Sequence, residues 1–320
     1  MVCSCTTRES SVEPTDRPKK SVRVLFAPDK IGDSSFNDNI LSGILKEQQN
    51  NDFQLHVHYL NDMSKADSTV RAWMTEENEN VYTVFAGSEF ESSVRKAGVS
   101  DYHSDYLIFD TPSRDLPMSA FHFCGYGASY LAGIAAFELT QANSAVCLGA
   151  YPGEAYVNEC FDGFKDGFMD SGGKMVEVIY MMNSTEGYSK PERAYEMADS
   201  LSRIYPFMYA MTGGANMGIY QFLRENPDAD MHTLGVIVDQ QNYSDRIIGS
   251  IMTEIGACAG NAVRLWSEGV QVEPYQQFGL ESEYIWFKVA DRYMDRIGII
   301  INQNKAKAIM KENEYESLLE

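Results

Sequence analysis

Short apolar runs alternate along the chain with longer stretches whose apolar positions recur at helical spacing, most plainly over residues 155–170 and 191–203. Short runs of β-branched and aromatic residues bounded by Gly, Pro, Asp or Ser are typical of buried strands. The pattern predicts strands at 22–28, 53–60, 82–87, 105–110, 119–125, 144–151, 175–181, 205–211 and 232–239. Such alternation indicates βαβ units, and its division into two series favours two parallel sheets over one.

Residues 245–268 are expected to form one long amphipathic helix. Its apolar face would carry Ile247, Ile248, Ile251, Ile255, Cys258, Ala262, Leu265 and Trp266. A stripe of this kind normally faces a protein core, so we assign these side chains to packing.

The length of 320 residues is about twice that of a usual single domain, which predicts two lobes with a cleft between them. Hydrophobic residues make up 44% and charged residues 22%, as in ordinary globular proteins. No apolar run approaches the roughly 20 residues that cross a bilayer. The formal charge of −20 repels phosphate backbones, so nucleic acid is excluded as a partner.

Residues 1–21 are rich in Ser, Thr, Pro and charge and have no apolar period, which predicts a flexible N-terminal tether. No apolar signal sequence precedes Cys3 or Cys5. The other cysteines lie scattered in apolar or helical segments, where buried thiols are the commoner state and disulfides or metal ligands the alternative. These cysteines are Cys124, Cys147, Cys160 and Cys258.

Residues that directly follow the predicted strands are the candidate ligand contacts, because open α/β sheets bind ligands beyond the carboxyl ends of their strands. The candidates are Asp33, Ser34, Phe36, Asn37, Ser88, Asp110, Gly213, Gly214, Ala215, Met217 and Asp239. Asp33, Ser34 and Asn37 have an alternative role as caps of the next helix. The loop TGGANMG lacks the Gly-Lys-Ser/Thr ending of a phosphate-binding P-loop, and carboxylates such as Asp110 and Asp239 would oppose a phosphate. The candidates therefore favour an uncharged ligand.

Five motifs occur in order between about residues 22 and 290: GDSSFND (32–38), GASYLAGIAA (127–136), AYVNECFDGFKDGF (155–168), TGGANMGIYQFLRE with LGVIVDQQ (212–241), and FGLES (278–282). In this order they resemble the basic membrane protein family of bacterial lipoproteins. Members of that family are purine-nucleoside receptors and serve as substrate-binding components of ABC-type uptake systems.

The resemblance implies an α/β chain with the type I periplasmic-binding-protein fold, in which two Rossmann-like lobes are joined by three crossings. The first lobe would comprise residues 22–122 and about 242–277, and the second residues 123–241 and about 278–320. A purine nucleoside would be enclosed between the lobes.

The resemblance also implies residue roles. Phe36 would stack on the purine, Asp33 would accept hydrogen bonds from the base edge, and Asp239 would accept them from the ribose. This sequence departs from the family pattern at Glu281, where relatives usually have a lysine. The change replaces a cationic donor to the sugar with an acidic acceptor and leaves the identity of the neutral ligand open.

The implied function is that of a monomeric binding protein at the cell envelope, held by lipid on Cys3 or Cys5 and delivering its ligand to a membrane permease. A nucleoside hydrolase built on Asp33, Asp110 and Asp239, or a ligand-sensing regulator of the same fold, are the alternatives. The sequence contains no HExxH, GxSxG or metal-ligand spacing. We therefore expect no catalytic residues, no cofactor and no metal, with His56, His58 and His122 in ordinary packed or surface positions.

Overall fold

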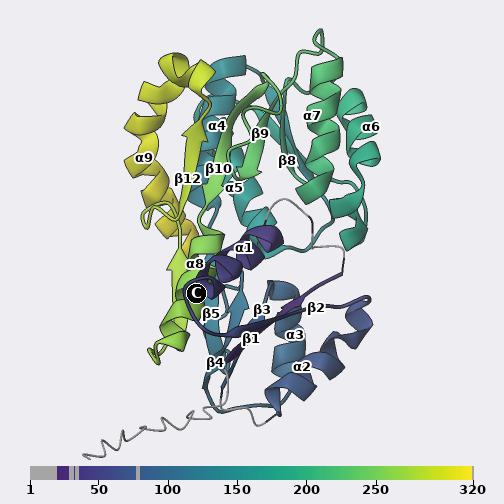
Figure 1. The fold of residues 1–320 in the computed structure, drawn as a ribbon. Helices are drawn as coiled ribbons and strands as arrows, with labels where there is room; N and C mark the ends of the chain where they lie inside the picture. Colours follow the sequence, from purple (N-terminus) through teal and green to yellow (C-terminus); the bar gives the residue numbers. More distant parts are fainter. Residues whose placement is uncertain (1–19, 29–31, 33–35, 77–79, 319–320) are drawn as a thin grey trace, which may run out of the picture.

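The computed structural model describes residues 20–28, 32, 36–76 and 80–318. Two six-stranded sheets form two lobes stacked along the long axis of the molecule (Figure 1). The strand order is β11-β5-β4-β3-β1-β2 in the first sheet and β12-β10-β9-β8-β6-β7 in the second. All paired strands run parallel except β10 and β12, which are antiparallel. The predicted α/β architecture of two parallel sheets is confirmed.

The first lobe consists of β1 (Ser21–Phe26), α1 (Phe36–Gln48), β2 (Gln54–Tyr59), α2 (Ala66–Met74), β3 (Val81–Phe85), α3 (Glu91–Lys96), β4 (His103–Phe109), β5 (Met118–Phe123), α8 (Ile255–Ser267) and β11 (Tyr275–Phe278).

The second lobe consists of α4 (Tyr126–Thr140), β6 (Ser144–Gly149), α5 (Ala155–Asp170), β7 (Met175–Tyr180), α6 (Pro191–Leu201), β8 (Phe207–Met211), α7 (Asn216–Glu225), β9 (His232–Ile237), β10 (Ile247–Thr253), β12 (Ile285–Val289) and α9 (Met294–Glu316).

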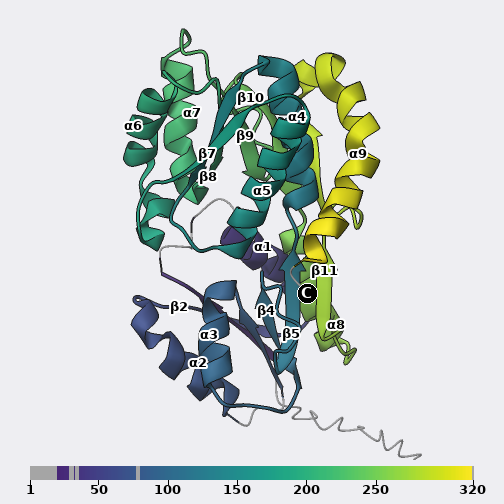
Figure 2. The same cartoon turned by 180° about the vertical axis from the view of Figure 1, so that it is seen from behind.

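The chain passes between the lobes from β5 to α4, from β10 to α8 and from β11 to β12. These are the three expected crossings. Helix α9 runs along the outer side of the second lobe, and its end lies at the waist between the lobes, as both views show (Figures 1 and 2). The C-terminal turn of the chain is thus placed beside the crossings.

The expected helix over residues 245–268 is wrong in its first part, because Ile247–Thr253 is strand β10 and only Ile255–Ser267 is helical. Strand β10 lies between β9 and β12 and is buried on both faces, so its apolar residues do not alternate with polar ones and their spacing imitates a helical stripe. As β10 belongs to the second sheet, the predicted boundary near residue 242 differs from the sheet membership. Strands β11 and β12 were not predicted either.

Helices α4 and α5 pack closely, which explains two glycines of the motif at 155–168. A Cβ on Gly167 of α5 would lie 2.0 Å from the carbonyl oxygen of Tyr130 on α4, and one on Gly163 would lie 2.2 Å from that of Tyr126. The hydroxyls of these tyrosines donate hydrogen bonds back to α5. Tyr126 donates to Asp166 at 2.6 Å, and Tyr130 donates to Asp170 at 2.7 Å. The close spacing of these two helices therefore requires glycine, whose side chain is a single hydrogen atom, at positions 163 and 167.

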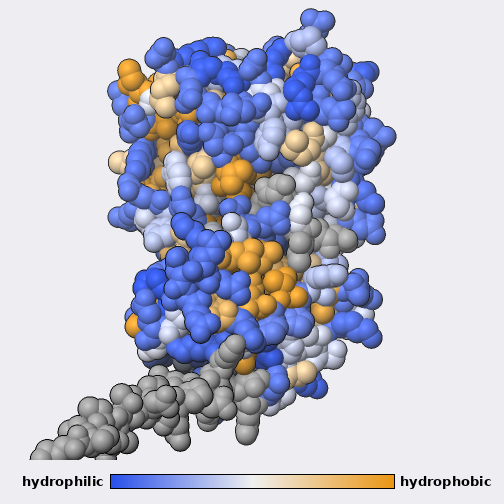
Figure 3. All heavy atoms as spheres, viewed as in Figure 1, coloured by the Kyte–Doolittle hydropathy of each residue, from blue (hydrophilic) through white to orange (hydrophobic). Residues whose placement is uncertain are grey.

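The four cysteines expected to be buried thiols are free and buried, which confirms the prediction for Cys124, Cys147, Cys160 and Cys258. The space-filling view of one face is dominated by hydrophilic residues over both lobes, in keeping with the acidic composition (Figure 3). In the described part of the chain, none of the helices has the length and apolar character needed to cross a membrane.

Candidate functional site

A cavity lies between the two lobes, with about 670 Å³ of empty space that includes open solvent at its mouth. The first lobe contributes the start of α1 and the residues that follow β3 and β4. The second lobe contributes the start of α5 with the residue before it, the turn after β7, the end of β8 with the loop that follows, and the end of β9. Its lining residues are Phe36, Asn37, Ala86, Gly87, Ser88, Glu89, Asp110, Glu154, Tyr156, Val157, Tyr188, Met211, Gly213, Val236 and Ile237.

Two lining residues have a backbone conformation that is rare for residues other than glycine. Asp110 follows β4 with φ 60°, and Ile237 ends β9 with φ 69°. The left-handed region is particularly unfavourable for a β-branched side chain such as that of Ile237. Strained residues of this kind concentrate at binding and catalytic sites, where the surrounding fold holds them in place. Here one such residue comes from each lobe, and both face the same cavity.

Every charged residue among the described lining residues is a carboxylate, namely Glu89, Asp110 and Glu154. Ionised carboxylates accept hydrogen bonds and donate none. The lining therefore suits a ligand that brings hydroxyl or N–H donors, and it opposes a phosphate.

The carboxylate of Glu154, just before α5, is held by two tyrosines. Its Oε1 accepts a hydrogen bond from the Tyr151 hydroxyl at 2.9 Å, and its Oε2 accepts one from the Tyr188 hydroxyl. Burial, and after it the Glu154 charge, raises the pKa of Tyr188, so this phenol stays a neutral donor. Gly213 has φ 55°, and a Cβ there would lie 2.8 Å from the ring of Tyr188. The glycine is needed for the ring to lie against the loop that follows β8.

Phe36 is the first residue of α1 and half-buried at the cavity. Its ring meets that of Phe123 edge-on, with centroids 6.2 Å apart and planes at 87°. Packing against the first lobe fixes one edge of the ring.

Of the residues predicted from strand ends, five line the cavity: Phe36, Asn37, Ser88, Asp110 and Gly213. Four others are described but are not among the lining residues. Gly214, Ala215 and Met217 lie in the turn and helix beyond Gly213, and Glu281 lies exposed in the crossing from β11 to β12. Asp33 and Ser34 lie outside the described residues.

Asp239 is likewise absent from the described lining and forms an ion pair. Its Oδ2 lies 2.6 Å from Lys288 Nζ on β12, and it also accepts hydrogen bonds from the backbone and side chain of Gln241. Burial opposes the charge of Asp239, but these donors outweigh it and lower its pKa. The structure thus gives this carboxylate partners within the protein.

Several lining residues were missed by the sequence reasoning, above all Glu154, Tyr156 and Tyr188. Glu154 and Tyr156 follow the predicted strand at 144–151, so the rule that selected Asp110 would have found them. Tyr188 lies in the turn Thr185–Ser189, beyond the residues that directly follow the predicted strand at 175–181, and no local pattern marks it.

The family model described as Bmp, ABC transporter substrate-binding protein PnrA-like, matches residues 20–318 of this chain. No curated protein sequence matches it.

Solved structures share the fold at low sequence identity. The solute-binding protein of an ABC transporter system from Aeropyrum pernix K1 has a TM-score of 0.70 and 16% identity, with 92% of this chain and 86% of that chain covered. A transcriptional activator of the comK gene from Bacillus halodurans has a TM-score of 0.62 and 16% identity, covering 89% and 97%. A sugar-binding protein of a sugar ABC transporter from Bacillus halodurans has a TM-score of 0.60 and 14% identity, covering 87% and 99%.

These neighbours agree with the two-lobed type I periplasmic-binding fold, and the family match extends over nearly all of the described chain. Membership of such a family implies a small-molecule ligand and a membrane permease as partners. The chain belongs to the Bmp family of PnrA-like ABC transporter substrate-binding proteins.

Proposed function

We propose that this protein captures a neutral purine nucleoside, or a closely similar small molecule, in the cavity between its lobes for an ABC-type uptake system. The observation that carries the proposal is the chemistry of the lining, which combines an aromatic ring with carboxylates and contains no cation among its described residues. The motifs shared with purine-nucleoside receptors supply the ligand class.

Each part of a nucleoside matches a feature of this lining. Phe36 offers a ring to a purine face, an interaction worth about 1–3 kcal/mol in nucleic-acid complexes. Glu89, Asp110 and Glu154 offer acceptors to sugar hydroxyls and to N–H groups on the base. A nucleotide would bring its phosphate toward the same carboxylates and should be rejected.

The binding test is calorimetry of the full chain with inosine, adenosine and ribose, and with inosine monophosphate as the charged competitor. We expect a nucleoside to bind and the monophosphate to bind far more weakly. Phe36→Ala should weaken nucleoside binding by about 5- to 150-fold, the equivalent of losing one stacked base.

Tyr59→Ala is the matched control, because Tyr59 is an exposed aromatic on β2 outside the described lining. A folded Phe36→Ala variant with unchanged affinity would remove the stacking role. Tight binding of the monophosphate would contradict the argument from the carboxylates.

The same samples distinguish a receptor from a nucleoside hydrolase. Chromatography after incubation should recover the nucleoside intact, whereas a hydrolase would release the free base. Such release would overturn the assignment as a binding protein.

The proposed setting is the cell envelope, with residues 1–21 as the tether and lipid on Cys3 or Cys5, as in the lipoproteins that this chain resembles. In its native cell the protein should incorporate labelled fatty acid and fractionate with membranes. Recovery of unlabelled protein in the cytosol would favour a ligand-sensing regulator of the same fold.

A further inference from the structure

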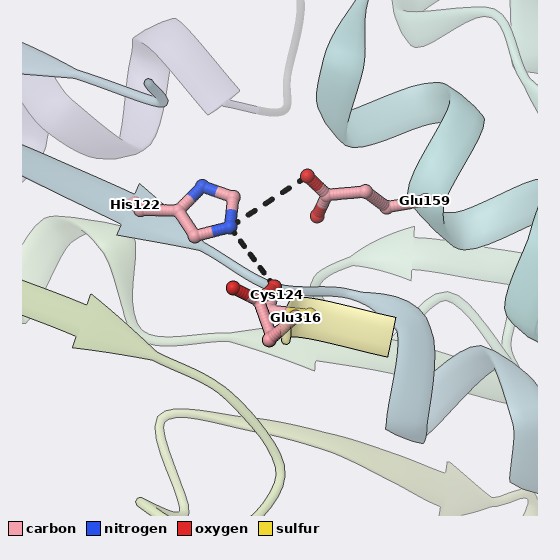
Figure 4. Close-up of side chains that lie close together, drawn as sticks. All are labelled: His122, Cys124, Glu159 and Glu316. Atoms are coloured by element: carbon pink, nitrogen blue, oxygen red, sulfur yellow. Dashed lines mark hydrogen bonds and ion pairs between the residues drawn. The ribbon is translucent and has the colours of Figure 1, made fainter. Parts of the chain in front are cut away.

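Four side chains with metal-binding atoms meet at the waist between the lobes, and none of them lines the cavity. They are His122, Cys124, Glu159 and Glu316, all buried (Figure 4). One ligand atom from each can be chosen so that all four atoms lie within 4.8 Å of one another. The sequence contains no short metal-binding motif that would predict this group, because Glu316 lies 194 residues from His122.

The fold brings the four together from both lobes. His122 lies on β5 and Cys124 directly after it, two residues apart in extended chain, so their side chains point to the same side. Glu159 comes from α5 of the second lobe, one turn beyond the cavity residues Tyr156 and Val157. Glu316 is the last residue of α9, whose end reaches the waist.

Two of the separations are close to those of ligands around one tetrahedral ion. His122 Nε2 lies 3.2 Å from Glu316 Oε1 and 3.6 Å from Glu159 Oε1. Bonds of about 2.0–2.3 Å to a tetrahedral Zn²⁺ place neighbouring ligand atoms about 3.3–3.7 Å apart. Because all four atoms lie within 4.8 Å of one another, the wider pairs would have to close by up to about 1 Å around the ion.

The group also contains hydrogen-bonding capacity that the described residues leave unused. Glu159 is only 2% exposed, and its Oε2 has no hydrogen-bond partner among the described residues. Figure 4 shows the Glu159 carboxylate directed toward His122, with Cys124 and Glu316 on the other side of the ring nitrogen. A buried carboxylate with an unpaired oxygen is costly unless a cation or a proton compensates it.

We propose that His122, Cys124, Glu159 and Glu316 form a closed site for one Zn²⁺ ion at the junction of the two lobes. One imidazole, one thiolate and two carboxylates are a ligand set that Zn²⁺ accepts, and four protein ligands are typical of structural rather than catalytic zinc. The ion would join β5 of the first lobe to α5 and α9 of the second, directly behind the cavity wall. This site is independent of the nucleoside proposal.

The test uses the full chain after removal of metals with a chelator. Zn²⁺ is titrated in competition with a chromophoric chelator, and Co²⁺ is added to a second sample as a spectroscopic substitute. We expect one tightly bound Zn²⁺ per chain, a raised melting temperature, and a Co²⁺ spectrum with tetrahedral d–d bands and thiolate charge transfer. Cys124→Ser should abolish the charge-transfer band and weaken Zn²⁺ binding by at least about 100-fold, since even partners outside the ligand shell cost about 10- to 100-fold.

Control variants separate this site from the other thiols and from the acidic surface. Cys258→Ser changes a buried thiol on α8, and a double change of Cys3 and Cys5 to serine removes the N-terminal thiols. Both should keep the cobalt spectrum. Should Cys124→Ser fail to fold, Glu316→Gln removes a different ligand and should weaken Zn²⁺ binding while leaving circular dichroism unchanged. The proposal is overturned by a lack of stoichiometric Zn²⁺ binding, or by a charge-transfer band that survives Cys124→Ser or disappears with Cys3 and Cys5.

Discussion

The close contact between α4 and α5 gives a stability prediction with a definite sign. Gly167→Ala places a methyl group where the carbonyl oxygen of Tyr130 lies only 2.0 Å away, whereas real Cβ atoms essentially never approach closer than 3.0 Å. The two helices must therefore separate by at least 1 Å at this point. The obstacle is backbone within a buried helix, which cannot rotate aside as a side chain can.

The matched control is Gly298→Ala on α9. The Cβ added there would first meet Met294 Sδ at 2.5 Å, the far end of a flexible side chain that can change rotamer. Both substitutions exchange a helical glycine for alanine, which by itself favours the helix by about 1 kcal/mol. Only Gly167→Ala also overpacks two helix backbones, and overpacking a core typically costs about 1–3 kcal/mol.

Urea denaturation followed by circular dichroism measures the free energy of unfolding of the two variants. Gly298→Ala should be as stable as the wild type or more so, and Gly167→Ala should be less stable than Gly298→Ala by about 1–3 kcal/mol with an unchanged dependence on urea. If Gly167→Ala were as stable as Gly298→Ala, the helix spacing would not be set by the glycine, and the packing account of the FDGFKDGF motif would be refuted.

Two further predictions concern ionisation. Lys288→Met should move the pKa of Asp239 upward in an NMR titration, because the lost Lys288 donor is a main stabiliser of the ionised carboxylate; an unchanged titration would mean that Gln241 suffices. Burial, and after it Arg246, lowers the pKa of His232 below 6.5, so unfolded protein takes up this proton more readily and stability should fall as the pH drops from 6.5 through the folded pKa. His232→Gln should remove that part of the acid sensitivity, and equal pH profiles for variant and wild type would contradict it.

Much of the fold was readable from the sequence because the deciding forces are local. Residues 155–170 were predicted as a helix and form α5 with those bounds. Their apolar residues recur at helical spacing, and the segment is bounded by a loop before it and by Gly172 and Gly173 after it. Strands β1 and β3 were found because they are short, apolar and bounded by turn residues. The error at β10 has the same origin: a strand buried on both faces carries no alternation to distinguish it from a helix.

Only part of the cavity lining could be predicted from the sequence. Phe36, Asn37, Ser88, Asp110 and Gly213 follow strands and line the cavity, because parallel strands deliver their carboxyl ends to one edge. Asp239 also follows a strand, β9, yet it pairs with Lys288, a residue 49 positions away on β12 of the same sheet. The position of a residue after a strand predicts where its backbone lies in the sheet, and it does not predict which side chain from a distant part of the sequence will bind it.

By itself, then, the sequence determined most of the elements before β10, their parallel arrangement in two lobes and several of the loops that meet at the cleft, because periodicity and turn chemistry act over a few residues. Only the tertiary structure decided which distant groups share a volume: Tyr188 with Glu154 at the cavity, and Glu316 with His122 at the waist. Such encounters depend on the packing of whole helices and on crossings between sheets. Their energy comes from burial and charge in three dimensions, and no local pattern of residues encodes it.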